Sequence, residues 1–205
     1  MAGLLANFRN TMVVSLLLSF VMIYSFGTGR FDDPIFWQAI LRWVHVVAGI
    51  LWIGLLYYFN FVQIRKMPDI PAELKPAVSK YIAPEALFWF RWAALVTVLA
   101  GLTVAYLRGV DYAHETLSLG LAGGFVEGDY GFTLMGVGMW LGIVMMLNVW
   151  GLIWPNQKIA LGIKEGYDAD AKAKAAKTAM LFSRTNLLLS LPMLTAMTMY
   201  QTLIG

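Results

Sequence analysis

His45 is the residue whose type and surroundings most plainly allow chemistry, because it is the only histidine inside a long apolar stretch of the chain. A neutral imidazole in such a place can ligate haem iron, pass protons, or form a hydrogen bond with a neighbouring helix. Gly49 and Trp52 follow one and two helical turns later, so a flat macrocycle could approach the glycine and stack on the indole. The residue pattern leaves all three uses of His45 open.

These residues lie on one face of the helix expected over about 35–64. At 100° per residue, that face covers a sector of roughly 80°. It comprises Gln38, Arg42, His45, Gly49, Trp52, Leu56, Asn60 and Gln63. A polar side chain turned to lipid has no partner, so we expect this face to contact other helices or a cofactor. Arg42, one turn from His45, is suited either to a carboxylate such as a haem propionate or to anchoring the helix at the membrane interface.

A second ligand for a metal at His45 has two kinds of candidate. His114 lies in the loop expected after the third span, on the side of the membrane nearer to His45, so folding of that loop inward would give a six-coordinate site. The methionines expected on the fourth span are alternative soft ligands, although methionine more often fills gaps in a core. They are Met135, Met139, Met145 and Met146. We therefore expect haem b as a possible cofactor, with His45 on the iron and Arg42, Gly49, Trp52 and His114 around it.

Arg91 is the other residue within an expected span whose charged side chain is costly to place in an apolar environment. It is expected to extend to the interface or to pair with Glu85, the nearest acid in its helix, and holding an anionic group is the alternative.

The composition indicates an integral membrane protein. Of 205 residues, 60% are hydrophobic and 13% charged, with a mean hydropathy of +0.68, whereas soluble domains carry about 25% charged residues. The absence of cysteine excludes disulfides, thiolate metal sites and the C-x-x-C-H attachment of c-type haem. The net charge of +3 does not suggest nucleic acid, and the spans contain no hydrolase site, phosphate loop or repeat typical of transporters.

Five stretches are long enough to cross the hydrocarbon, which takes about 20 apolar residues. They cover approximately 4–26, 35–64, 82–107, 130–153 and 179–203. The sequence thus predicts one all-α membrane domain over 1–205, a bundle of five transmembrane helices. The first stretch is expected to be a retained anchor rather than a signal peptide, because no small-x-small cleavage site follows it. An alanine- and lysine-rich run predicts a cytoplasmic helix over about 165–178 that continues into the fifth span.

Charge placement predicts a cytoplasmic N-terminus and a periplasmic C-terminus, because basic residues concentrate on cytoplasmic segments. Eleven basic residues would lie inside: Arg9, Arg65, Lys66, Lys75, Lys80, Lys158, Lys164, Lys172, Lys174, Lys177 and Arg184. Only Arg30 and Arg108 would lie in the outside loops. Those loops also carry the acids Asp32, Asp33, Asp111, Glu115, Glu127 and Asp129. An acidic outer face would attract a basic partner.

Four strings resemble one family. They are WVHVVAGILWIGLLYYFNFVQ (43–63), KMPDIPAELKPAVSKYIAPEALFWFRW (66–92), NVWGLIWPNQKIALG (148–162) and AKAKAAKTAMLFSRTN (171–186). In this order they resemble the membrane domain of bacterial membrane-bound urate hydroxylases, the urate oxidase N-terminal domain family, over about 36–203. More loosely, the pattern from His45 to Gly54 is similar to membrane proteins of the copper-resistance and protoporphyrinogen-oxidase types, some of which hold haem b.

The resemblance implies a multi-pass protein of the bacterial inner membrane that takes part in electron transfer. Family members typically carry about eight helices and a C-terminal cytochrome c domain, neither of which this sequence contains. We therefore expect electrons to leave to a separate protein, for which a basic c-type cytochrome at the acidic outer face is the candidate. The alternative is a non-catalytic accessory subunit of a larger respiratory or photosynthetic membrane complex. No catalytic residue is assigned.

Overall fold

The computed structural model describes residues 2–121 and 130–204, and within these residues every regular element is helical. The chain divides into two compact units, Met1–Ile40 and Leu41–Gly205.

In the first unit, a short helix α1 (Ala2–Leu5) is followed by the long apolar helix α2 (Phe8–Gly27). Asn7 separates them and caps α2, since its side chain accepts a hydrogen bond from the Asn10 amide at 3.2 Å. A Cβ at Gly27 would overlap the ring of Phe36, so the glycine allows the chain to fold back closely after α2. The predicted span over 4–26 is therefore interrupted by its own N-cap residue.

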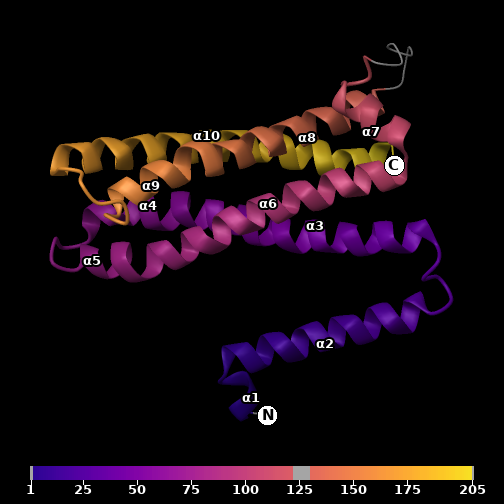
Figure 1. The fold of residues 1–205 in the computed structure, drawn as a ribbon, viewed down its shortest axis with the longest axis horizontal. Coiled ribbons are helices and arrows are strands. Elements are labelled where there is room, and N and C mark those ends of the chain that lie inside the picture. The colour runs from indigo at the N-terminus through magenta and orange to yellow at the C-terminus, as the bar shows by residue number, and fades with distance from the viewer. Residues whose placement is uncertain (1, 122–129, 205) are drawn as a thin grey trace. The chain divides into compact units, whose positions relative to one another are not determined.

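The second unit begins within α3 (Pro34–Tyr57) and contains the remaining helices (Figure 1). In chain order they are η1 (Tyr58–Gln63), α4 (Ile64–Lys66), η2 (Met67–Asp69), α5 (Lys75–Ala77), η3 (Val78–Ile82), α6 (Ala83–Arg108), α7 (Val110–Leu117), α8 (Gly131–Asn148), η4 (Val149–Ile153), α9 (Trp154–Ala160) and α10 (Ala169–Leu203). The segments η1, η3 and η4 are π-helical, and η2 is a 3₁₀ turn.

Four continuous helical stretches in the described residues are long and apolar enough to cross a membrane. They are Phe8–Gly27, Pro34–Asp69, Lys75–Arg108 and Gly131–Ala160. The all-helical fold, with helices long and apolar enough to span a membrane, is thus as predicted. The expected fifth span falls in α10, whose polar residues dilute its hydropathy, and it is not among these four.

Two predicted boundaries are wrong for the same physical reason. The third span was expected to begin near residue 82, but helix runs from Lys75 through Pro84. The fourth span was expected to end near residue 153, yet helix continues through Pro155 to Ala160. Proline lacks an amide hydrogen and crowds the preceding turn of an α-helix. Here a π-helical segment, η3 or η4, directly precedes each Ala-Pro or Trp-Pro pair and widens that turn.

The helices α8 and α10 pack side by side (Figure 1). Gly138 of α8 permits the approach, because a Cβ there would lie 3.1 Å from the Cβ of Ala196. Asn186 is fully buried, and its Nδ2 donates to the carbonyl oxygen of Met145 at 2.9 Å. Its Oδ1 accepts a hydrogen bond from the side-chain Nδ2 of Asn148 at 3.0 Å. Other residues of the same two helices, among them Gly142 and Met193, line the cavity described next.

Candidate functional site: a cavity beside His45

A cavity of about 760 Å³ lies inside the second unit, between α3, α6, α8 and α10. Glycine, aliphatic and methionine side chains form most of its lining, with a few polar groups among them. Four of the residues expected around a cofactor, Arg42, His45, Gly49 and Trp52, line it together. The polar face of the second predicted span is therefore directed partly at this cavity.

His45 is held in a defined orientation. Its Nδ1 lies 2.7 Å from the carbonyl oxygen of Thr97 on α6. A carbonyl oxygen only accepts, so Nδ1 donates and carries the ring hydrogen. In the neutral imidazole, Nε2 then keeps its lone pair, and it makes no hydrogen bond within the described part of the chain. The ring is thus prepared to act as a ligand or a base through Nε2.

Gly101 on α6 provides the space for the imidazole. A Cβ at this position would lie 2.8 Å from Nδ1 and 2.9 Å from Cε1 of His45. Gly49 has a different role, since a Cβ there would meet only Cγ2 of Thr97, at the ordinary distance of 3.6 Å. Gly49 is therefore not required for helix contact, and its missing side chain instead enlarges the cavity.

Trp52 lies at the buried side of the cavity. Its side chain is 1% exposed and belongs to the hydrophobic cluster that joins α3, α6 and α8. Its Nε1 is buried and has no hydrogen-bond partner among the described residues. A buried donor without an acceptor is costly, and Trp52 contributes its ring to the cavity wall while its nitrogen stays unsatisfied within the packed cluster.

Two arginines stand at the end of the cavity near α7. Arg42 and Arg108 both line it and are both exposed. Arg108 also lies over the ring of Tyr112, 4.4 Å from the ring centroid. Burial, with a hydrogen bond to Tyr200, raises the pKa of Tyr112 to about 12 against the opposing effect of Arg108. At neutral pH this end therefore carries two positive charges beside a neutral phenol.

The structure separates His114 from the other expected site residues. His114 is exposed on α7 and does not line the cavity. Of the four methionines expected as alternatives, Met135 and Met139 line the cavity. Met193 and Met197 of α10 line it too. Methionine side chains therefore reach the cavity, whereas His114 is not among its lining residues.

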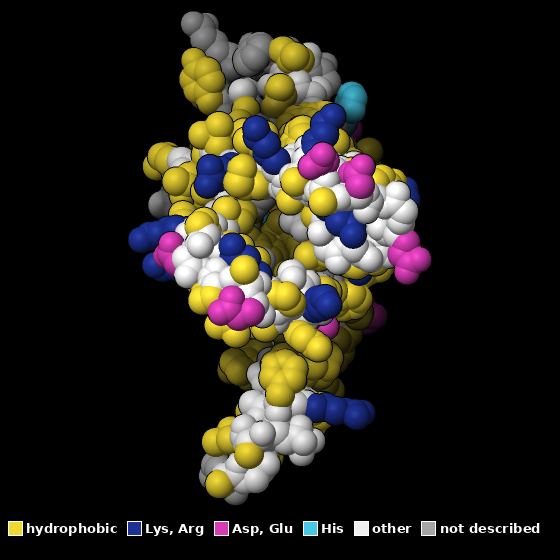
Figure 2. All heavy atoms as spheres, turned by 90° about the vertical axis from the view of Figure 1, so that its left-hand side faces the viewer, with side chains coloured by type: hydrophobic (Ala, Val, Ile, Leu, Met, Phe, Trp, Pro, Cys, Tyr) yellow, Lys and Arg dark blue, Asp and Glu magenta, His cyan; other side chains and the backbone are white. Residues whose placement is uncertain are grey.

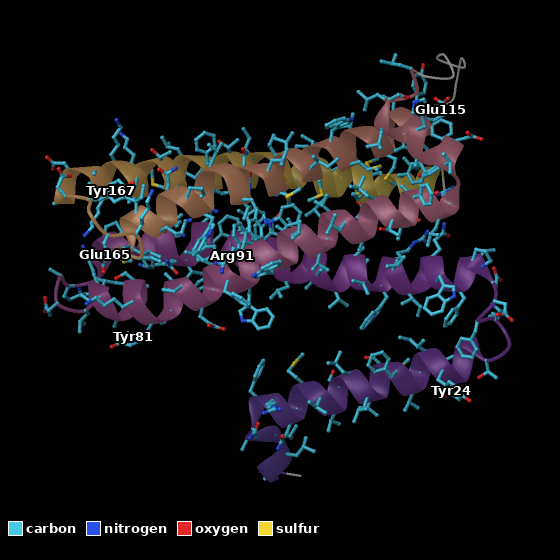
Figure 3. All side chains as sticks on the ribbon, in the orientation of Figure 1. Tyr24, Tyr81, Arg91, Glu115, Glu165 and Tyr167 are labelled. Carbon is cyan, nitrogen blue, oxygen red and sulfur yellow. The ribbon has the colours of Figure 1, made fainter. Side chains whose placement is uncertain are left out.

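Arg91 lies away from the cavity, on the side of α6 that faces α9 (Figure 3). It does not pair with Glu85, whose Oε1 accepts a hydrogen bond from Nε1 of Trp89 at 2.9 Å. Instead, its guanidinium carbon lies 4.0 Å from the centroid of the Trp154 ring.

Several site residues have no signal in the sequence beyond their type. Thr97 and Gly101 lie on α6 and position His45 of α3. Arg108 and Tyr112 reach the cavity only because of the way in which α6 is joined to α7. A glycine in the middle of an apolar helix is the one feature that could have drawn attention to Gly101. Of the acids expected on the outer face, Glu127 and Asp129 lie outside the described residues.

No protein-family model, curated protein or solved structure matches this chain.

Proposed function

We propose that this protein is a membrane redox protein that binds haem b in the cavity beside His45. The observation that carries the proposal is the hydrogen bond from Nδ1 of His45 to the carbonyl oxygen of Thr97, which leaves Nε2 free beside a large apolar cavity. Metal-ligating histidines in proteins commonly donate their other ring nitrogen to a carbonyl oxygen or carboxylate, which fixes the tautomer and strengthens the ligand.

The volume of the cavity supports a ligand of the size of haem. Its volume of about 760 Å³ falls within the range of about 300–1,000 Å³ found for cofactor and ligand sites. Gly49, Gly54 and Gly142 line it from α3 and α8. A Cβ at Gly54 or Gly142 would meet no atom within 4 Å, so these glycines are not explained by helix packing.

The charges at the cavity also fit a haem. Its two propionates need cations beside an otherwise apolar site, and Arg42 and Arg108 both line this cavity. The remainder of the macrocycle needs the aliphatic and methionine surface that forms the rest of the lining. When bound, haem iron supplies one-electron transfer, while the chain orients the ligand, excludes water and balances charge.

The role in electron transfer rests on the resemblance of four sequence strings to membrane-bound urate hydroxylases. We propose that electrons leave to a separate protein, with a basic c-type cytochrome as the candidate. Exposed Asp111 on α7 and neighbouring Glu115 support docking at the end of the bundle where Arg42 and Arg108 also lie.

We further propose that α10 forms a fifth crossing, with a cytoplasmic N-terminus and a periplasmic C-terminus in a bacterial inner membrane. The concentration of basic residues on one set of loops supports this orientation. Figure 2 views the end of the second unit that bears α4, α5 and the start of α10, where Lys and Arg side chains surround a central hollow.

The test is an absorption spectrum of the natively purified protein with and without His45. We expect a Soret band in the wild type and its loss in His45→Ala, with partial recovery on addition of imidazole. His114→Ala is the matched control, because His114 is the other histidine in the sequence and lies away from the cavity. A colourless wild type from haem-replete cells would contradict the proposal and leave the accessory-subunit alternative.

A further inference from the structure

Arg91 is a charged residue inside a span that has no acidic partner. It lies two turns into α6, and the single ion pair found in the described residues joins Lys66 and Asp69. Its Nη1 is buried without a hydrogen-bond partner among those residues. An unpaired guanidinium that is partly buried is costly, and an anion bound beside it would offset part of that cost.

The guanidinium of Arg91 is nevertheless held in place by aromatic groups. Its central carbon lies 4.0 Å from the centroid of the Trp154 ring and 5.2 Å from that of Phe88. The main-chain oxygen of Arg91 accepts a hydrogen bond from Nε1 of Trp150 at 3.0 Å. A ring face attracts a cation but offers no lone pair to an N–H group, so the guanidinium donors still require an oxygen acceptor.

A second cation shares the same tryptophan. The Nζ atom of Lys158, one turn further along in α9, lies 5.7 Å from the centroid of the Trp154 ring. Lys158 also forms no ion pair within the described residues. The two positive groups around one indole repel each other, and an anion bound beside both would offset that repulsion.

The tryptophans around Arg91 indicate the depth of this cluster. Trp92 and Trp150 contact each other edge to face, with ring centroids 5.3 Å apart. Trp89 and Trp92 are 47% and 43% exposed. Tryptophans concentrate at the level of lipid headgroups, so the Arg91 cluster lies where phosphate groups are abundant.

We infer that Arg91, Lys158 and Trp154 form a site for a phosphate group, supplied by the headgroup of an anionic phospholipid. Arginine binds phosphate oxygens through paired N–H donors, and lysine adds a point charge. The site is separate from the cavity at His45, because none of these three residues lines that cavity. It therefore does not depend on the proposed binding of haem.

The test compares variants of the delipidated protein in detergent by thermal unfolding. Short-chain phosphatidylglycerol should raise the Tm of the wild type by about 2–4 °C at saturation, and phosphatidylcholine should raise it by much less. We expect Arg91→Gln to lose the shift and Lys158→Gln to lose at least half of it. Lys66→Gln is the matched control, because it removes a charge at the same end of the bundle from a lysine already paired with Asp69.

A parallel titration with inorganic phosphate separates the two sources of the anion. A shift equal to that of phosphatidylglycerol supports a phosphate site filled by free phosphate, whereas a shift with the lipid alone supports the headgroup. Equal shifts with both lipids, or an undiminished shift in both Arg91→Gln and Lys158→Gln, would overturn the inference.

A second readout covers the possibility that Arg91→Gln does not fold. Native mass spectrometry should find phosphatidylglycerol retained by the wild type and by Lys66→Gln, and retention at least halved in Lys158→Gln. Equal retention in all three proteins would likewise overturn the inference.

Discussion

The position of His45 depends on the absence of a side chain at Gly101. In Gly101→Ala, the new Cβ would lie within 3 Å of Nδ1 and Cε1 of His45. Because the obstructing atoms belong to a side chain, we expect the ring to shift while the backbone stays in place. The hydrogen bond to Thr97 would be lost, at a cost of about 0.5–1.5 kcal/mol in the free energy of unfolding. We expect haem content, measured per chain after native purification, to fall at least several-fold.

Gly151→Ala is the control for Gly101→Ala. Gly151 is also helical, and a Cβ there would meet no atom within 4 Å. It should keep its haem content and gain slightly in stability from better helix propensity. If Gly101→Ala kept haem as the control does, the arrangement of His45 described above would be wrong.

Tyr112 provides a prediction on pH. Burial and the hydrogen bond to Tyr200 raise its pKa to about 12 in the folded protein, whereas an unfolded tyrosine ionises near 10. The unfolded chain therefore releases this proton first as the pH rises. The stability contributed by the neutral phenol is present below pH 10 and is lost as the pH rises through about 12. Tyr112→Phe should therefore lose stability less steeply than the wild type in this range, measured by thermal unfolding.

Tyr106→Phe is the control for that titration, because Tyr106 is 59% exposed near the same end of α6. It should follow the wild-type curve. Parallel curves for all three proteins between pH 10 and 12 would contradict the assigned environment of Tyr112.

At the scale of single residues, the sequence predicts which residues share a helix face, but it does not predict their partners on other helices. Helical periodicity alone places Arg42, His45, Gly49 and Trp52 together, and all four line the cavity. The contact of Gly101 with His45 depends on which helix lies opposite and at what height. No periodicity within one helix contains that information.

At the scale of elements, buried asparagine side chains connect α8 to α10. Asn186 is fully buried and bonds to both Asn148 and Met145 of α8. Its replacement by leucine would remove both hydrogen bonds and leave the carbonyl oxygen of Met145 without its side-chain donor. Hydrogen bonds between membrane helices contribute about 0.6–1.7 kcal/mol each. We expect Asn186→Leu to lower the free energy of unfolding by about 1–3 kcal/mol, as measured by denaturant titration in detergent micelles.

Thr195→Val provides the comparison on the same helix. Thr195 is exposed, and its hydroxyl donates only to the Leu191 oxygen within α10. Its replacement should change stability by less than about 0.5 kcal/mol. Similar losses in the two variants would show that the contact between α8 and α10 does not depend on Asn186.

Helix existence follows from apolar length, whereas helix ends depend on local geometry. The third and fourth spans were expected to begin near residue 82 and to end near residue 153, next to Pro84 and Pro155, and proline disrupts α-helical hydrogen bonding. The π-helical segments Val78–Ile82 and Val149–Ile153 accommodate them, and both helices continue. Such π-helical segments have no established sequence signature, so the sequence alone could not predict that these two helices continue past their prolines.

At the scale of the whole molecule, the number of crossings is the property to test. The chain contains no cysteine, so single cysteines can be introduced without background. We expect Lys174→Cys to react with an impermeant thiol reagent only from the cytoplasmic side, and Thr202→Cys and Asp111→Cys only from the periplasmic side. Labelling of intact cells and of inverted membrane vesicles measures this directly.

Labelling of the cysteines at 174 and 202 from the same side would show that α10 does not cross the membrane. Composition predicts the all-helical class of the chain, with helices long and apolar enough to cross a membrane, because stretches of about 20 apolar residues suffice for a crossing as helix. It does not decide the case of α10, in which polar side chains that bond to neighbouring helices lower the hydropathy of the helix.

The most direct test of the central claim is an anomalous difference map, recorded at the iron edge, from crystals of the natively purified protein. The account predicts a single iron peak in the cavity, bonded to Nε2 of His45, while Nδ1 still donates to the oxygen of Thr97. A cavity that holds lipid or detergent without iron, or an iron peak bonded elsewhere, would contradict it.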